Sequence, residues 1–498
     1  MTGAILYVPY LAKLPDGIHA WAQADRLALA INFYDYGFQF FTPRTSNLSS
    51  IGGITGVEFP LQAYLAALGG LVFGRENIGI LFRLLDVAMV LLGFFYLFRL
   101  VYERTGNFVA GLVPGVFLLV SPAFGFYAVS TLPDPFSLSL SFIGYYYWLR
   151  FMDRRQFADL LTALLVLGLA ALIKTTVLLH LGAVLGITSL WCFLYPDLLS
   201  FRQRLYFLGV ALGVLGAIAG VYFRTQYLNA TYQSSMFLAE ARPITDPQTR
   251  HEVVRNVHNM WSGQYAALWQ YAALGIAGGL LVVFARRNLR HYLPLTLLLL
   301  AALAVAGLFV QLMGAQFRDH DYYMICSLFP PAILLLLLAL LNLGRYQGTV
   351  GRIMRLGLAV LVVFSLVRAY KHLHRRMSDD YPPFTPYGHL WMRGGAAELA
   401  RLHVPATATI LLFNEPAPNL GPVYFDRRGQ IWQAPDTAQV TADALLKRMA
   451  IDHLDYLIMA PAVYARLAPQ HAALAAGFEL VGQQPAVVLR RRNHRQPW

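Results

Sequence analysis

The chain has 498 residues, of which 57% are hydrophobic and 13% are charged, with a formal net charge of +13. Soluble globular proteins carry about 25% charged residues, so the composition excludes an ordinary soluble protein and predicts about ten membrane spans with a modest extramembrane part. The positive charge lies in short arginine clusters between apolar runs, which is typical of a membrane topology signal and not of a nucleic-acid-binding surface. Cys192 and Cys326 both lie in apolar stretches, so they predict neither a disulfide framework nor a metal site.

Ten apolar runs are long enough to cross a bilayer. They are 78–100, 107–124, 135–152, 158–173, 175–195, 205–223, 267–285, 293–313, 323–342 and 355–371. A fragment at 4–12 is too short to cross alone, and with it we predict about eleven spanning helices. Only about a dozen residues precede the loop that starts at residue 13, so we expect a longer native N-terminus.

Arginines are concentrated in alternate connections between these runs, as in Arg150, Arg154 and Arg155. Basic loops stay in the cytoplasm, so the other set of connections is predicted to lie outside. That outer set is poorer in basic residues and richer in acidic, histidine and aromatic residues. It consists of 13–77, 125–134, 173–175, 224–266 and 314–322.

The first outer connection carries the densest group of polar residues. From Trp21 to Phe33 it predicts an amphipathic helix at the membrane interface. Trp21 and Asp25 are four residues apart and therefore share a helix face. Taken alone, Asp25 is most simply a solvated surface residue. Glu58 opens a second apolar segment, 58–73, where the helix dipole by itself would favour an acid.

Three later outer connections add polar residues at membrane boundaries. Asp134 lies in a Leu-Pro-Asp-Pro string, where a helix cap and a functional acid are equally good interpretations. Lys174 lies in a tight turn between two spans, where a lysine finds a partner or ligand, or extends to the headgroups. The segment 318–323 reads Arg-Asp-His-Asp-Tyr-Tyr, and a charged boundary with tyrosines explains about half of it.

The chain changes character after the last span. Thr407–Phe413 and Asp455–Met459 predict short buried strands, and Ala442–Met449 and Pro461–Ala475 predict helices. Residues 376–498 are therefore predicted to form a small α/β domain, which the odd span count places outside. No nucleotide-binding glycine-rich loop occurs in it.

Taken together, three acids, a lysine and a His/Tyr cluster come from separate outer connections at the membrane surface. Lysine and tyrosine can hold the phosphate of a lipid-linked substrate. A carboxylate can act as a general base on an acceptor hydroxyl.

The string His19–Phe33, with Gln23-Ala-Asp25, and the later Glu58-Phe-Pro-Leu61 resemble the membrane glycosyltransferases of the GT-C fold. More narrowly, the sequence is similar to the bacterial branch related to protein O-mannosyltransferases, to the lipid A aminoarabinose transferase and to the lipopolysaccharide galacturonosyltransferases. The resemblance covers about residues 13–340. It implies an α-helical polytopic membrane protein of GT-C type, with a transmembrane glycosyltransferase domain in 1–375 and an extracytoplasmic α/β domain in 376–498.

The same resemblance implies a hexosyl- or pentosyltransferase of lipopolysaccharide or other cell-envelope biosynthesis. Its donor would be a sugar on a polyprenyl phosphate, and its acceptor an envelope glycan, lipid or protein. The enzyme would lie in the bacterial inner membrane, with its active site and C-terminal domain facing the periplasm. Transfer would be a direct displacement at the anomeric carbon with inversion.

Matched residue by residue, the resemblance implies a catalytic set of Asp25, Glu58 and Asp134, with Asp25 as the base or acceptor-positioning group. Relatives often carry lysine at the position of Phe59, so this chain departs from the pattern at one phosphate contact. The implied substrate-binding residues include a lysine that meets the lipid phosphate and a tyrosine near it. They are Lys174, Tyr323, His320, Asp321, Trp21 and Gln23, with no role assigned to His320 or Asp321.

Two points stay open at the site. No cofactor is required by this chemistry, but Glu58, Asp134 or His320 could bind a divalent cation. An arginine of the 224–266 loop could add a phosphate contact, and nothing in the sequence selects among Arg224, Arg242, Arg250 and Arg255.

The main alternative function is a transporter or flippase of lipid-linked glycans, which needs a polar path across the bilayer. Arg83 and Asp86 are the one close charged pair inside a span, and their spacing predicts a local ion pair. No internal repeat is visible, which weakens this alternative. A third possibility is a non-catalytic scaffold, which the presence of all three acids and the lysine disfavours.

Overall fold

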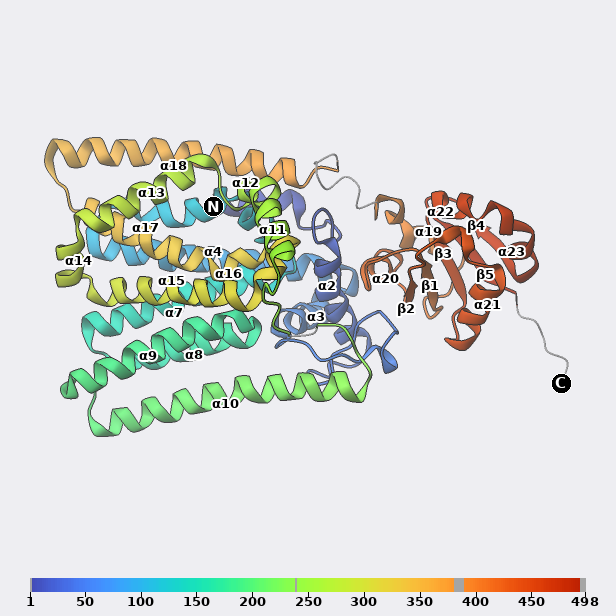
Figure 1. Ribbon diagram of the computed structural model, residues 1–498, viewed down its shortest axis with the longest axis horizontal. Coiled ribbons are helices and arrows are strands. Elements are labelled where there is room, and N and C mark those ends of the chain that lie inside the picture. Colours follow the sequence, from blue (N-terminus) through green and yellow to red (C-terminus); the bar gives the residue numbers. More distant parts are fainter. Residues whose placement is uncertain (1, 238–239, 380–388, 493–498) are drawn as a thin grey trace. The chain divides into compact units, whose positions relative to one another are not determined.

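The computed structural model describes residues 2–237, 240–379 and 389–492, which form mainly helices and one sheet (Figure 1). The chain divides into two compact units. We call the first the helical unit; it contains residues 1–12, 83–224 and 238–383. We call the second the sheet unit; it contains residues 13–82, 225–237 and 384–498.

Each of the ten predicted apolar runs is helical, and two of them, 107–124 and 323–342, are each broken into two helices. The helices are α4 (Ile78–Thr105), α5 (Phe108–Val120), α6 (Pro122–Tyr127), α7 (Pro133–Arg154), α8 (Phe157–Ile173), α9 (Leu178–Leu194), α10 (Phe201–Thr231), α13 (Leu268–Val283), α15 (Leu293–Met313), α16 (Tyr323–Ser327), α17 (Phe329–Leu343) and α18 (Gly348–Arg376). Shorter helices of the same unit are α1 (Thr2–Tyr7), α11 (Pro247–Asn256), α12 (Ser262–Tyr265) and α14 (Ala285–His291).

Local sequence explains where these helices begin. The Asn107 side chain accepts a hydrogen bond from the Ala110 N–H at 3.0 Å and caps α5. Ser121 caps α6 in the same way, accepting from the Phe124 N–H at 3.2 Å. Pro133 takes the first position of α7, where its missing N–H costs nothing. Asp134 consequently lies in the first turn, where the helix dipole favours an acid.

Several helices of the described residues are long and apolar enough to cross a membrane. They lie within Arg75–Thr105, Thr175–Leu194, Phe201–Thr231, Leu293–Arg318 and Gly348–Arg376. A pair bent by 88°, Pro247–Tyr265 with Leu268–Val283, meets the same criterion when taken together. The protein is therefore a multi-pass membrane protein, and the number of about eleven spans stays a prediction.

The sheet unit contains five strands in the order β2-β1-β3-β5-β4. They are β1 (Ile410–Phe413), β2 (Gly429–Trp432), β3 (Tyr456–Met459), β4 (Phe478–Gly482) and β5 (Val487–Arg491). Strands β2, β1 and β3 are parallel, and β5 and β4 are antiparallel to their neighbours. The predicted strands are confirmed as β1 and β3, and the small C-terminal domain is confirmed as α/β.

The described residues of the sheet unit also form seven helices. They are α2 (Ala20–Asp35), α3 (Leu61–Phe73), α19 (Gly395–Arg401), α20 (Leu420–Phe425), α21 (Ala442–Ile451), α22 (Pro461–Arg466) and α23 (His471–Gly477). Side chains alternate between the two faces of β1. Ile410 and Leu412 pack in one core with residues of α2, α3 and α20, and Leu411 and Phe413 pack in a second core with residues of α21 and α23.

Helix α2 therefore belongs to the core of the sheet unit. It packs against α3 and α20, and most of its side chains are buried, including the polar ones at Gln23, Asp25 and Asn32. The helix predicted from Trp21 to Phe33 is confirmed, but it is not amphipathic, because polar as well as apolar side chains are buried. Alanines such as Ala24 and Ala28 are small enough to let other helices approach on two sides, which an apolar-stripe pattern does not reveal.

Candidate active site

Asp25 is a buried carboxylate held by a side chain from the C-terminal domain. It is 6% exposed, and its Oδ1 accepts a hydrogen bond from Asn419 Nδ2 at 2.8 Å. Burial raises the pKa of Asp25 to about 6, although the Asn419 hydrogen bond and the charge of Arg26 oppose the rise. The interpretation of Asp25 as a solvated surface residue is therefore wrong. A buried carboxyl group that titrates near neutral pH has the properties of a general base.

Glu58 lies just before α3 and pairs with the residue next to Asp25. Arg26 donates to Glu58 Oε2 at 2.8 Å, and its guanidinium lies 5.0 Å from the centre of the Phe237 ring. Both partners of the ion pair are partly shielded, at 15% and 21% side-chain exposure. Glu58 thus holds the cation that favours the ionised form of Asp25.

The two other predicted residues of α2 differ in exposure. Gln23 is 1% exposed, and its amide donates to the carbonyls of Asp16 and Ile18 at 3.2 and 3.5 Å, which secures the turn before the helix. Trp21 is 37% exposed, and its ring packs edge-to-face with His19 at 6.1 Å. Trp21 is therefore the member of this pair with a surface that a ligand can contact.

Phe59, where the resemblance predicts that relatives carry lysine, lies in an aromatic cluster. Its ring lies 4.8 Å from that of Phe40, which also contacts Tyr64 at 5.0 Å and Phe33 at 6.3 Å. Aromatic pairs at these distances add stability beyond the area that they bury. This position therefore contributes packing in the sheet unit and no cationic phosphate contact.

Asp134 and Lys174 meet inside the helical unit. Asp134, in the first turn of α7, is 1% exposed, and Lys174 follows the last residue of α8. Lys174 Nζ lies 3.4 Å from Asp134 Oδ1. The ammonium also lies 6.0 and 5.8 Å from the ring centres of Tyr322 and Tyr323. The lysine of this turn thus has a protein partner, and its side chain is 14% exposed.

His320 packs on the same two tyrosines. Its ring lies 5.5 Å from Tyr322 and 5.4 Å from Tyr323, and its Nδ1 lies 3.2 Å from the Gln316 carbonyl oxygen. The π-electrons of the same two rings attract the Lys174 ammonium. The structure therefore brings Asp134, Lys174, His320 and Tyr323 into one cluster.

Asp321 has a different environment and is fully buried. Arg376, at the end of α18, donates to its Oδ2, and the Tyr127 hydroxyl donates to its Oδ1 at 2.6 Å. Arg376 also donates to Gln264 Oε1 at 2.8 Å. These contacts join α6, α12 and α18 to the segment that carries His320 and Tyr323. Asp321 therefore orders this end of the bundle, which the sequence could not assign to it.

Four of the predicted outer connections consequently meet within the helical unit. Tyr127 comes from 125–134, Gln264 from 224–266 and Asp321 from 314–322, while Lys174 adds the short turn between α8 and α9. Figure 1 shows α11, α12 and α16 at the same end of the helical unit. The polar residues of these connections thus gather at one end of the bundle.

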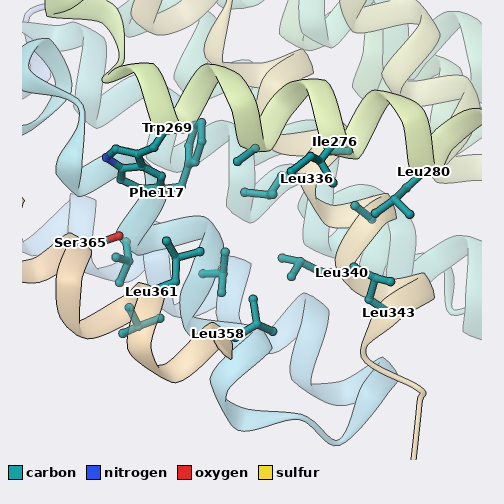
Figure 2. A pocket seen from close by; sticks show the side chains of 16 residues that line it. Phe117, Trp269, Ile276, Leu280, Leu336, Leu340, Leu343, Leu358, Leu361 and Ser365 are labelled. Atoms are coloured by element: carbon teal, nitrogen blue, oxygen red, sulfur yellow. The ribbon is translucent and has the colours of Figure 1, made fainter. Parts of the chain in front are cut away.

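The helical unit also contains an apolar cavity of about 240 Å³ between α5, α13, α17 and α18 (Figure 2). Phe117, Leu336 and Leu340 contribute to its wall, and Trp269 and Ser365 line it toward the same end of the view. Ile276 also lines it and is 67% exposed, so the cavity reaches the side of the bundle. An apolar cavity of about 150 Å³ stays dry and binds small apolar molecules. This larger one can accept part of a hydrocarbon chain.

Residues that the sequence did not single out hold the predicted acids. The sequence does contain a signal for Arg376. His374, Arg375 and Arg376 lie at the predicted outer end of a span, whereas positive charge usually lies at the inner end. Asn419 has none, since 394 positions separate it from Asp25. Within the described ranges, no group of three or more His, Cys, Asp and Glu residues is placed to hold a metal ion.

Comparison with known proteins relates this geometry to known folds. Residues 58–223 match the family model of dolichyl-phosphate-mannose-protein mannosyltransferases. The structure of ArnT from Cupriavidus metallidurans bound to undecaprenyl phosphate superposes with a TM-score of 0.59 at 13% identity, covering 99% of this chain and 97% of that one. The chain has the GT-C fold.

The apo state of the same ArnT gives a TM-score of 0.57 at 15% identity, with 98% and 96% of the two chains covered. Agreement over nearly the full length of both chains includes the C-terminal domain. The predicted resemblance to GT-C glycosyltransferases related to protein O-mannosyltransferases and ArnT is thereby confirmed, and the findings support a glycosyltransferase. No curated protein matches this chain in sequence.

Proposed function

We propose that this GT-C protein transfers a sugar from a polyprenyl-phosphate donor to an acceptor in the cell envelope, at the outer face of the bacterial cytoplasmic membrane. The acceptor is a hydroxyl or phosphate of a glycan, lipid or protein. The observation that carries the proposal is Asp25, a buried carboxyl group whose pKa is raised to about 6. A general base works best when its pKa lies near the operating pH.

The Asp134–Lys174 cluster supports the donor side of the proposal. Lys174 is positioned by Asp134 at 3.4 Å and flanked by Tyr322 and Tyr323. Its ammonium is a compact charge suited to one phosphate, and the tyrosines add hydroxyl donors. The fold neighbour ArnT, whose structure contains undecaprenyl phosphate, agrees with such a donor. The apolar cavity of the helical unit offers surface for a hydrocarbon chain.

The proposed reaction is a single displacement. The acceptor oxygen attacks the anomeric carbon and forms the new glycosidic bond, while its proton passes to the Asp25 carboxylate. The bond between the anomeric carbon and the phosphate oxygen breaks, and polyprenyl phosphate leaves with the electron pair, so the configuration inverts. Phosphate is a good leaving group, and the protein therefore acts mainly by positioning and charge stabilisation.

The test is turnover by purified protein in detergent, with a radiolabelled polyprenyl-phosphate sugar and an envelope extract as acceptor. At a donor concentration below its KM, we expect label in a covalent product in wild type and much less of it in Lys174→Gln. Labelled lipid that only crosses the bilayer of a proteoliposome, without a covalent product, would overturn the proposal in favour of transport. Product formation that EDTA abolishes and a divalent cation restores would add a metal at Glu58, Asp134 or His320.

The buried charges in α4 do not favour the transport alternative. Arg83 and Asp86 are 3% and 1% exposed. Arg83 donates to the Val129 carbonyl, in the predicted outer connection 125–134. This contact ties α4 to the end of the bundle where the polar cluster lies, so Arg83 has a structural role there.

A further inference from the structure

The C-terminal α/β domain supplies a side chain that contacts the acid of the first outer loop. Asn419 is 0% exposed and Asp25 is 6% exposed, and the donor and acceptor atoms are 2.8 Å apart. Both residues belong to the sheet unit. A hydrogen bond between two groups this deeply buried is protected from competition by water.

A second contact sets the orientation of the Asn419 amide. Its Oδ1 accepts the backbone N–H of Asn47 at 2.9 Å, and the Asn47 side chain donates to the Pro418 carbonyl at 2.9 Å. A backbone N–H can only donate, so it selects the oxygen of the amide. The NH₂ group must then face Asp25, whose ionised carboxylate can only accept.

The Asn419 side chain does not cap the helix that it precedes, although its position predicts that it would. It is the N-cap residue of α20, and asparagine is among the best capping side chains. Its side chain nevertheless makes no capping hydrogen bond and points to Asp25 and Asn47 instead. The Asn419 amide therefore makes tertiary hydrogen bonds, and the first turn of α20 has no side-chain cap.

The edge of the sheet holds the residue that orients this amide. The Gly429 N–H donates to the Ser46 carbonyl at 3.0 Å, and the Leu48 N–H donates to the Gly429 carbonyl at 2.7 Å. Gly429 begins β2, the edge strand, and a Cβ there would lie 1.9 Å from the Ile410 carbonyl oxygen. Only glycine fits this position, so the segment around Asn47 is hydrogen-bonded to a strand that lies close against β1.

We propose that Asn419 is a positioning residue for the base: the C-terminal domain holds the Asp25 carboxylate in its ionised form and in one orientation. The inference rests on the proposed role of Asp25. Arg26, on the same helix, is the other group that favours ionisation. The helices packed against α2 contribute one titratable side chain each, Tyr64 from α3 and Tyr424 from α20.

The test is the pH dependence of kcat/KM in Asn419→Ala. Loss of a hydrogen bond to a charged group is expected to move the acidic limb of the profile upward by roughly one to two pH units. Activity at pH 6 is therefore expected to fall about five- to fiftyfold and to recover as the pH rises above the shifted limb. Asn414→Ala is the matched control, because this asparagine of the same domain donates to Thr437 Oγ1 at 3.0 Å and leaves Asp25 untouched. We expect its profile to be unchanged.

A merely structural role would lower activity equally at all pH values without moving the limb, and this result would overturn the inference. If Asn419→Ala does not fold, Asn47→Ala loosens the same amide through Pro418 and is expected to give a smaller shift in the same direction. An unshifted limb in that variant would also overturn it.

A readout without activity separates this inference from the proposed function. The difference in melting temperature between wild type and Asp25→Asn, measured against pH, reports the titration of Asp25. Its midpoint is expected to move upward when both proteins also carry Asn419→Ala. If the midpoint of this pH dependence moves but the protein transfers no sugar, the proposed function is rejected and the effect of Asn419 on Asp25 is retained. If the protein transfers sugar but the midpoint does not move, only the positioning role of Asn419 is rejected.

Discussion

Replacing Asp25 by asparagine separates the cost of burying a carboxylate from its use in the reaction. Burial raises the pKa of Asp25 from its ordinary value of 3.8 to about 6. A carboxyl group whose folded-state pKa is raised contributes stability that is present below pH 4 and is lost as the pH rises through 6. At 1.36 kcal/mol per pKa unit, the rise amounts to about 3 kcal/mol.

The Asp25→Asn protein is therefore expected to be more stable than wild type at pH 8, by up to about 3 kcal/mol, with no such advantage at pH 4. Its side-chain oxygen can still accept from Asn419, so the fold keeps this contact. Sugar transfer is expected to fall by about 10²- to 10⁴-fold, the usual contribution of a general base.

The assay pairs thermal melting in detergent at both pH values with transfer from a radiolabelled polyprenyl-phosphate sugar. Asp35→Asn is the matched control on the same helix, because Asp35 is partly exposed and pairs with Arg75 at 2.7 Å. A pair of this kind contributes at most about 1 kcal/mol, and transfer should be unaffected. Near-wild-type transfer by Asp25→Asn would refute the assignment of the base. An equal melting difference at pH 4 and pH 8 would refute the electrostatic reasoning.

Further predictions concern the helical unit and the aromatic cluster. Lys174→Gln should raise the KM for the donor by about ten- to a hundredfold, the worth of a hydrogen bond to a charged group, and Lys174→Arg should recover part of it. Arg376→Leu leaves buried Asp321 without its cation and should destabilise the protein by about 3–5 kcal/mol. The double variant Arg376→Leu with Asp321→Leu should recover much of the lost melting temperature. No recovery in the double variant would contradict the pairing of these two residues. Phe59→Lys should lower the melting temperature without lowering the KM for the donor, and a lowered KM would show that the position can still bind phosphate.

The apolar runs and the strands at β1 and β3 were predictable because their signals are local. A helix that faces lipid needs a continuous stretch of apolar residues, and a buried central strand needs a short one. Both patterns are complete within a few turns or one strand of the sequence. Asp134 and Lys174 were found for a similar reason, since a charge at a membrane boundary stands out from its apolar neighbours.

The burial of α2 was not predictable in the same way. Its alanines and polar side chains read equally well as a surface helix, and the decision depends on α3 and α20, which flank it in the folded chain. Grouping the first outer loop with the C-terminal domain likewise depends on contacts between distant segments, such as Ser46 with Gly429. The division at residues 375 and 376 stays a prediction, because the compact units follow these contacts instead.

The sequence by itself determined the membrane class, the positions of the helices and the identity of the acids and the lysine, because composition and hydropathy are properties of short segments. Only the tertiary structure decided which partner each polar group has: Asn419 for Asp25, Asp134 for Lys174 and Arg376 for Asp321. A buried polar group must find a partner, but nothing in its own segment states which one. That choice is made by packing between parts of the chain that lie up to 394 residues apart.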